Sequence, residues 1–397
     1  MGLFPDVEYL NRLTKTRQSM ANKGIDVVIL FDPANMNYLS GYDGWSFYVH
    51  QMLIVFADEE QPYWVGRAQD ANGARHTTFL DADHIVPYPE DHIHSSERHP
   101  MDFAANFLKS KQCANKRIGV EKDAYYFTAL SLERLKVGLP NAHFVDATLL
   151  VNYVRLIKSD LEIELMCKAG VIASKAMRTA FECVEVGARQ CDVAAQIYQS
   201  QISGTEEFGG DYPSIVPLMP SGEKTSAPHI TWSDDRYQPG ETIIFELAGC
   251  VHRYHSPLAR TVTLGEPDSK VSYLAEVVVE GLNTALATVK PGVTLEEVEQ
   301  AWHNVIEKHG FEKESRLGYA MGLNYPPDWG EHTASIRKGD KTILVPNMTF
   351  HMIPGMWMDN YGVEISEAIR VTETGVEVFA DVPRELHVKP HLTLRGE

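Results

Sequence analysis

The stretch PGETIIFELAG, residues 239–249, places a glutamate inside an otherwise apolar run that follows a turn. The sequence YQPG, residues 237–240, is typical of a turn, and the apolar run predicts a strand over Thr242–Leu247. Tyr254–Leu264 is then predicted as its partner strand. A glutamate at such a position is costly unless a cation accompanies it. Glu246 is therefore either paired with an internal arginine, for example Arg260, or held there for a function.

Helices are predicted on both sides of these strands. Ser159 followed by Glu162 is a capping-box signature, and it predicts a helix that continues to about residue 186. The further predictions are helices over Cys191–Gln201, Val271–Val289 and Leu295–His309, and strands over Met348–Met352, Glu364–Val371 and Val376–Phe379. A helix pair followed by strands thus occurs twice. This order is consistent with a duplicated α+β domain.

The chain before this region alternates between helical and apolar patterns. The predicted elements are a helix over Leu10–Lys23, apolar runs over Asp26–Phe31, Gln51–Ala57 and Tyr63–Val65, a turn over residues 32–35, strands over Arg117–Val120 and Ala142–Asp146, and a helix over Ala124–Leu135. They indicate a small α/β domain. Because 397 residues is long for one core, we expect two domains, residues 1–157 and 158–397.

Composition narrows the partners and the compartment. The formal net charge of −18 disfavours nucleic acid and anionic membranes as partners. The five cysteines show no CxxC spacing, which fits a reducing compartment and argues against a cysteine-based zinc site. The first residues are acidic in part and show no apolar signal region. We therefore expect a cytoplasmic protein.

Six ordered segments resemble the family of creatinase, prolidase, aminopeptidase P and methionine aminopeptidase. They are YPSIVPLMPSGEKTSAPH (212–229), PGETIIFELAG (239–249), YHSPLARTVTLG (254–265), RLGYAMGL (316–323), VPNMTFHMIPG (345–355) and GVEISEAIRVTETG (362–375). DVVILFDPANMNYLSGYDG (26–44) extends the resemblance into the first domain. The resemblance implies a creatinase-type α/β N-terminal domain and an α+β C-terminal domain of the "pita-bread" fold.

The resemblance also predicts what has happened to the family's metal site. Its metalloenzymes hold two metal ions with two Asp, one His and two Glu. The matching positions here are Glu246, Pro257, Tyr319, Ile353 and Ser366. Only Glu246 keeps a carboxylate, and a pair of hard divalent ions needs several anionic oxygens. A slip of one residue to Glu367 would restore one carboxylate without rebuilding the site. We expect no metal and no other cofactor.

Two interpretations follow from such a loss. Creatinase is similar in lacking the metals, and it hydrolyses an amidine-type C–N bond with a histidine that matches His229. The alternative is a family fold reused for binding alone. The predicted pocket retains polar and aromatic side chains, and this favours catalysis. They are His229, Glu246, Tyr319, Tyr212, Glu364, Glu367, Trp329 and Trp357.

Two further segments resemble the ectoine hydrolase branch of this family. They are NYPPDWGEHTASIRKGDKT (324–342) and MTFHMIPGMWMDNYGVEISEA (348–368). Ectoine is a zwitterion, a cyclic amidinium carrying a carboxylate, and its ring carbon is electron-poor without a metal. A lone buried carboxylate would attract such a ring and could attack it or activate water. The predicted activity is hydrolytic ring opening to N-acetyl-2,4-diaminobutyrate.

The resemblance assigns roles to single residues. Glu246 is predicted as nucleophile or general base, His229 as proton shuttle, and Tyr319 as a hydrogen-bond donor to the substrate or the tetrahedral intermediate. For Trp329 and Trp357 two roles stay open, stacking on the amidinium and apolar packing or anchoring of a loop. The other predicted substrate contacts are Tyr212, Glu364, Glu367 and His255, with His332 as a further candidate, while no residue is assigned to the substrate carboxylate.

The family resemblance implies a homodimer in which the N-terminal domain of one subunit helps to close the pocket of the other. Trp45 and His50 are the residues expected near that partner pocket.

Three alternatives to the predicted function stay open. They are another metal-free amidine or amidino hydrolase, a proline-specific peptidase, and a non-catalytic binding protein.

Overall fold

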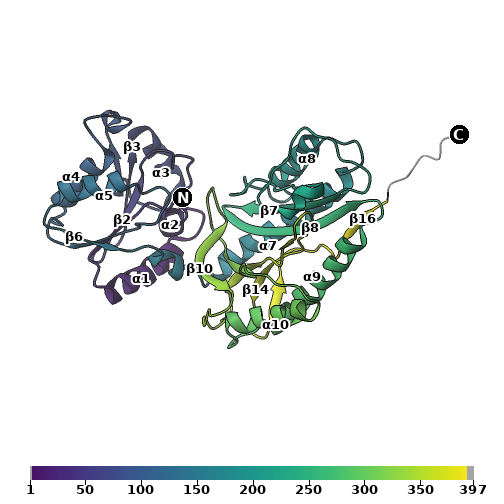
Figure 1. Cartoon of the computed structure of the whole chain (residues 1–397). Coiled ribbons are helices and arrows are strands. Elements are labelled where there is room, and N and C mark those ends of the chain that lie inside the picture. Colours follow the sequence, from purple (N-terminus) through teal and green to yellow (C-terminus); the bar gives the residue numbers. More distant parts are fainter. Residues whose placement is uncertain (1, 391–397) are drawn as a thin grey trace. The chain divides into compact units, whose positions relative to one another are not determined.

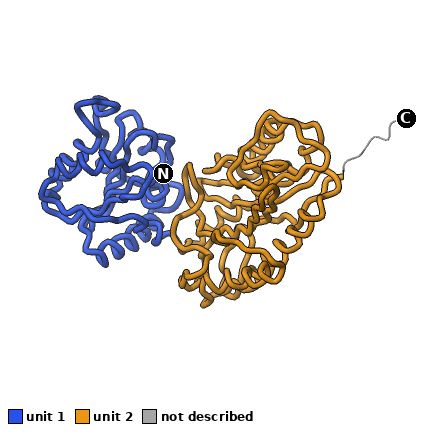
Figure 2. The backbone as a smooth tube through the Cα atoms, in the orientation of Figure 1, with its two compact units in different colours: residues 1–155 blue, residues 156–397 orange. Residues whose placement is uncertain are grey.

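The computed structural model describes residues 2–390, which divide into two compact units with the boundary between Arg155 and Leu156 (Figure 2). The domain boundary predicted after residue 157 falls just inside unit 2. Each unit has its own hydrophobic core. No helix within residues 2–390 has both the length and the apolar character needed to cross a membrane.

Unit 1 is built on a six-stranded mixed sheet with the order β4-β3-β2-β1-β5-β6. The strands are β1 (Val27–Leu30), β2 (Met52–Phe56), β3 (Tyr63–Arg67), β4 (Ile85–Tyr88), β5 (Arg117–Val120) and β6 (His143–Asp146). The α-helices are α1 (Asp6–Asn22), α2 (Pro33–Ser40), α3 (Ala71–Thr77), α4 (Pro100–Ser110), α5 (Ala129–Gly138) and α6 (Leu150–Val154), with short 3-10 helices at Ala68–Asp70, Ala82–His84 and Glu90–His92. The predicted α/β character of this part is therefore present.

Two local predictions in unit 1 were wrong, and both concern helix starts. The turn predicted over residues 32–35 is the beginning of α2, because Asp32 Oδ1 accepts a hydrogen bond from the Ala34 N–H at 2.8 Å and Pro33 occupies the first helical turn. The helix predicted from Ala124 begins only at Ala129, since the Thr128 hydroxyl caps it. The same residue types serve turns and N-caps, so composition alone did not separate them.

Unit 2 contains four longer helices and ten strands among its described residues (Figure 1). The helices are α7 (Asp160–Cys183), α8 (Gln190–Ser203), α9 (Ser269–Thr288) and α10 (Leu295–Lys308), with the 3-10 helix η4 at Gly222–Ser226. The strands are β7 (Thr242–Val251), β8 (Tyr254–Leu264), β9 (Gly318–Met321), β10 (Gly330–Ile336), β11 (Thr349–Met352), β12 (Met356–Trp357), β13 (Gly362–Val363), β14 (Glu367–Val371), β15 (Val376–Val378) and β16 (His387–Lys389). They form sheets of the orders β10-β9-β11-β14-β15, β16-β8-β7 and β12-β13.

The strand pair β7–β8 forms the centre of the first half of unit 2. Its register is antiparallel and unbroken from Thr242 opposite Thr263 to Val251 opposite Tyr254. Helix α7 packs on this pair so closely that a Cβ at Gly249 would lie 1.9 Å from the carbonyl oxygen of Ala169. Only glycine allows this approach.

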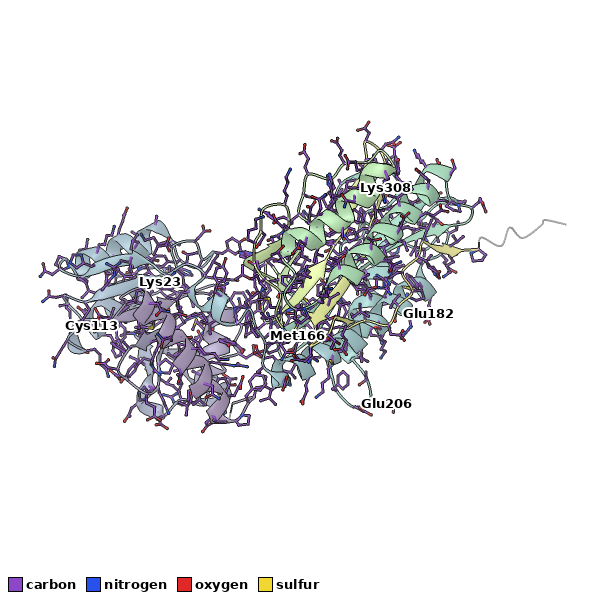
Figure 3. The ribbon with its side chains drawn as sticks, turned by 90° about the horizontal axis from the view of Figure 1, so that it is seen from below. Lys23, Cys113, Met166, Glu182, Glu206 and Lys308 are labelled. Atoms are coloured by element: carbon purple, nitrogen blue, oxygen red, sulfur yellow. The ribbon has the colours of Figure 1, made fainter. Side chains whose placement is uncertain are left out.

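The two halves of unit 2 repeat one arrangement. Buried residues of α7 and α8 share a core with β7 and β8, and Met166 of α7, labelled in Figure 3, is completely buried. Buried residues of α9 and α10 share a second core with β9, β11 and β14. The predicted capping box is present, because the Ser159 N–H donates to Glu162 Oε2 at 2.9 Å and the Ser159 hydroxyl accepts from the Glu162 N–H. The predicted pita-bread architecture is confirmed.

An arginine on β8 connects the two halves. Arg260 is fully buried, and its Nη2 atom lies 2.7 Å from Glu367 Oε1 at the start of β14. Its other donors reach the backbone carbonyls of Ser366, Pro383 and Val382 at 2.6–2.7 Å. The guanidinium therefore joins β8, the segment before β14 and the segment before β16.

We expect Arg260→Leu to lower the free energy of unfolding by about 3 to 5 kcal/mol, because it leaves the Glu367 carboxylate buried without its cation. Denaturant unfolding of the full chain measures this. Arg178→Ala is the matched control, since the Arg178–Asp381 pair is exposed and its loss should cost less than about 1 kcal/mol. Equal losses in the two variants would contradict a structural role for Arg260.

Candidate active site

Glu246 lies in the middle of β7 with 6% of its surface exposed. Its backbone N–H and C=O both pair with Leu218, at 3.0 and 2.8 Å, so the side chain is fixed on one face of the strand. Within residues 2–390 no Lys, Arg or His forms an ion pair with it. Burial, together with the negative charges of Glu364 and Asp328, raises the pKa of Glu246 well above its usual range. Glu246 is therefore a buried carboxylate without a paired cation among the described residues.

Glu364 is the second buried carboxylate of the site. Its backbone is fixed by Thr261 of β8, whose hydroxyl accepts from the Glu364 N–H at 2.8 Å and lies 2.9 Å from the Glu364 carbonyl oxygen. The Oε1 atom of Glu364 has no hydrogen-bond partner in the part of the chain that the structure describes. Burial raises the pKa of Glu364 to about 7, although the positive charge of Lys313 opposes this. Two neighbouring carboxylates that resist ionisation make a site suited to a cation.

Lys313 is a functional candidate that the sequence analysis missed. Its Nζ atom donates to the Gly355 carbonyl oxygen at 2.5 Å and lies 4.6 Å from the ring centroid of Trp357. Burial lowers the pKa of Lys313 to about 8, against the effect of Glu364. The indole N–H of Trp357 is buried without a hydrogen-bond partner among the described residues. Lys313 lies in the connection between α10 and β9, outside every matched motif, so no signal marked it.

Tyr319, Trp329, His351 and Ser366 form a chain of hydrogen bonds. The Trp329 N–H donates to Tyr319 Oη at 2.8 Å, Tyr319 Oη lies 2.9 Å from His351 Nδ1, and His351 Nε2 lies 2.8 Å from Ser366 Oγ. Burial lowers the pKa of His351 to about 3, so the imidazole is neutral. If Nδ1 carries the proton, Tyr319 accepts two hydrogen bonds and keeps its own O–H for a ligand.

The charge of Glu246 connects this chain to the carboxylates. Burial raises the pKa of Tyr319, and the negative charge of the neighbouring Glu246 raises it further, so Tyr319 stays a phenol.

His351 was also missed by the sequence analysis. It lies on β11, two residues before the matched position Ile353, and the two-residue period of a strand is the signal that could have found it.

Two predicted substrate contacts are occupied by the protein itself. Glu367 is paired with Arg260, so Ser366 and not Glu367 faces the site, and the one-residue slip does not occur. His255 Nε2 accepts from the Ser214 N–H at 2.9 Å, and Nδ1 lies 3.3 Å from the Gly322 carbonyl oxygen. Glu367 and His255 are therefore engaged in contacts within the protein, and their predicted contacts with the substrate stay predictions.

Other predicted residues lie apart from the carboxylates or in other contacts. His229 is exposed on the turn after η4, in the left-handed region at φ 67°, and its side chain has no hydrogen bond in the described structure. The Tyr212 ring lies 3.8 Å from the guanidinium carbon of Arg253. His332 is exposed and lies 2.6 Å from Asp328. The structure does not bring His229 into the hydrogen-bonded network.

Trp45 and His50 belong to unit 1. Trp45 is 57% exposed and contacts Phe47, with a distance of 4.7 Å between ring centroids. The His50 ring lies 4.6 Å from that of His99, and both line a cavity of about 220 Å³. Their expected role at a partner subunit stays a prediction.

Known families match both units of the chain. The model of "Metallopeptidase family M24" matches residues 164–373, and that of "Creatinase/Prolidase N-terminal domain" matches residues 12–157. The chain belongs to the creatinase/prolidase family. Ectoine hydrolase of Halomonas elongata is 44% identical, with 97% of this chain and 98% of that protein covered. An uncharacterized hydrolase/peptidase of Sinorhizobium fredii, y4tM, is 46% identical with the same coverage.

Solved structures of creatinase/prolidase family members share the fold. The prolidase of Thermococcus sibiricus superimposes with a TM-score of 0.84 at 22% identity, covering 96% of this chain and 99% of that one. Dipeptidase PepE of Mycobacterium ulcerans gives a TM-score of 0.81 at 22% identity, covering 98% and 100%. At this identity the similarity speaks for the fold alone.

The residues at the family's metal positions do not fit a pair of metal ions. Ser366 Oγ is already used by the Ala259 N–H at 2.7 Å and by His351, and Tyr319 Oη is used by Trp329 and His351. Among residues 2–390, no three His, Cys, Asp or Glu side chains are arranged to hold a metal ion. Hard divalent cations require several anionic oxygens, and this donor set offers them only Glu246.

We expect Glu364→Gln to gain stability relative to the unmodified protein as pH rises from about 4.5 to about 7. The folded pKa of Glu364 is raised, so the stability it contributes is fully present below about pH 4.5 and is lost towards about pH 7. The difference between the two proteins should grow by roughly 1 to 3 kcal/mol across this window. Unfolding at both ends of the window measures it, with the exposed Glu276→Gln as control. A difference independent of pH would show that Glu364 is not a buried, strained carboxylate.

Proposed function

We propose that this chain hydrolyses the cyclic amidine of ectoine to N-acetyl-2,4-diaminobutyrate. The observation that carries the proposal is the buried Glu246 carboxylate, which has no protein cation paired with it in the described structure and lies beside Glu364. The 44% identity to an ectoine hydrolase over 97% of the chain supports the same substrate.

The electrostatics of the site complement an amidinium. Burial disfavours the charged forms of Glu246 and Glu364, and the negative charge of Glu364 disfavours that of Glu246 further. A bound monocation would restore the charged forms by direct pairing, since an opposite charge within a few ångströms favours ionisation. Trp329 and Trp357 border the same region through their contacts to Tyr319 and Lys313, which suits a flat ring.

The reaction adds water across the ring carbon that lies between the two nitrogens. Glu246 either attacks this carbon, with water releasing the acyl group in a second step, or takes a proton from the attacking water. One C–N bond breaks, and the departing nitrogen takes up a proton. Tyr319, held by Trp329 and His351, is positioned to donate a hydrogen bond to the intermediate.

We propose further that the reaction needs no metal. The uncharged residues at four of the five matched ligand positions support this, and so does the chemistry of an amidinium. Its carbon is already electron-poor, whereas a metal pair would repel its positive charge.

A cytoplasmic homodimer remains part of the proposal. Support comes from the five free cysteines, two of them buried, and from the exposed Trp45 on unit 1. The substrate is the proposed small zwitterionic partner, and the formal charge of −18 argues against nucleic acid and anionic membranes.

Glu246→Gln should lower the rate of ectoine hydrolysis by about 100-fold to 10,000-fold, because the amide can neither attack nor accept a proton. Mass spectrometry of products formed by chelator-treated protein measures this. Glu223→Gln, an exposed change on η4, is the matched control and should keep full activity.

Activity that disappears with the chelator and returns with added metal would contradict the metal-free mechanism. Absence of product from the unmodified protein would remove ectoine as the substrate, and the assay would then turn to creatine and other small amidines. A pure binding protein would turn over none of them.

His229→Ala tests the proposed proton shuttle, and we expect a loss of about 100-fold in kcat. Lys313→Met is compared with it, because the pKa of Lys313 is lowered to about 8 and its ammonium faces Glu364. If kcat falls only in Lys313→Met, the proton donor is Lys313 and the role of His229 is refuted.

A further inference from the structure

A cavity of about 880 Å³ lies in unit 2, and two of its lining residues contact aromatic rings of the candidate active site. Its walls are the outer side of α10, the segment before β9 and the end of β10. The lining residues are Glu299, Gln300, His303, Glu307, Lys313, Glu314, Ser315, Arg316, Arg337 and Lys338. Lys313 and Arg316 belong both to this cavity and to the surroundings of Glu364 and Tyr319. These two residues therefore connect the wall of the cavity with residues of the candidate active site.

Arg316 is the cation of this wall that the fold does not use. Its guanidinium carbon lies 4.4 Å from the centroid of the Tyr319 ring, and Nη1 makes a long hydrogen bond of 3.3 Å to Ser335 Oγ. Within residues 2–390 no carboxylate forms an ion pair with the partly buried Arg316, and Asp328 acts on its charge only at longer range. An arginine fixed against an aromatic ring with free donors is ready for a carboxylate ligand.

We infer that Arg316 binds the carboxylate of the substrate, an inference that rests on the proposed function. Tyr319 lies between Arg316 and Glu246. Its ring contacts the Arg316 guanidinium, and the negative charge of Glu246 raises the pKa of its hydroxyl. In ectoine the carboxylate is attached to the carbon next to a ring nitrogen. An amidinium at Glu246 and Glu364 therefore has its carboxylate only a few bonds away, towards Arg316.

The other cations of the cavity fit this role less well. Lys313 already contacts the Gly355 carbonyl oxygen and the Trp357 ring. Its positive charge also favours the ionised form of Glu364. Arg337 and Lys338 are exposed at the rim. Arg316 alone combines a fixed position beside Tyr319 with unused donors.

Two substrates test the inference, ectoine and the same methylated ring without its carboxylate. Arg316→Gln should lower kcat/KM for ectoine by about 10-fold to 100-fold, the effect of losing a hydrogen-bonded charge. It should leave kcat/KM for the carboxylate-free ring unchanged. Arg316→Lys should recover part of the loss, since it keeps the charge without the paired donors. Arg337→Gln is the matched control, because it removes an exposed arginine from the same cavity.

An equal loss on both substrates would overturn the inference, because it would show that Arg316 only supports the fold or Tyr319. If Arg316→Gln does not fold, the same comparison is made with Arg316→Lys, and an equal loss there has the same meaning. Failure of the unmodified protein to hydrolyse either ring would instead refute the proposed function, and the inference would fall with it.

Discussion

The site depends on the cost of keeping two carboxylates, Glu246 and Glu364, inside a protein core. Burial raises the pKa of both carboxyl groups, and the negative charge of Glu364 raises the pKa of Glu246 further. Such an arrangement persists only where the surrounding structure fixes it. The unbroken register of β7 and β8 fixes Glu246, and the Thr261 hydroxyl fixes the backbone of Glu364. The strands thus hold the two carboxylates in positions that burial alone would disfavour.

The fold of the family is kept, while residues at two positions matched to its metal ligands form a hydrogen-bonded network. Ser366 and Tyr319 stand where metalloenzymes of the family place ligands, and His351 connects them with bonds of 2.8 and 2.9 Å. The neutral imidazole needs no metal to hold it there, because both of its nitrogens already have partners. In the proposed mechanism, the cation that enters the site is the substrate.

Sequence patterns predicted the parts of the molecule that depend on local chemistry. Turn residues, apolar runs and capping residues predicted β7, β8 and the capping box at Ser159. The family resemblance predicted that Glu246, Glu364 and Tyr319 share one pocket. Lys313 and Arg316 could not be found this way. They lie in a connection without periodicity, and their meaning comes from contacts to Trp357 and Tyr319 that form only in three dimensions.

The alternation of side chains at the start of β14 determines which contacts the two arginines near the site can make. Ser366 and Glu367 are neighbours in sequence, so their side chains point to opposite sides of the chain. Glu367 takes Arg260 into a buried structural pair, and Ser366 joins the hydrogen-bonded chain of the site. Because Arg260 is consumed in this way, it cannot neutralise Glu246, and it cannot hold a ligand carboxylate either. The separation of Arg260 from Arg316 leaves the site with an anionic end and a cationic end, and this polarity matches a zwitterion better than it matches a simple amidine.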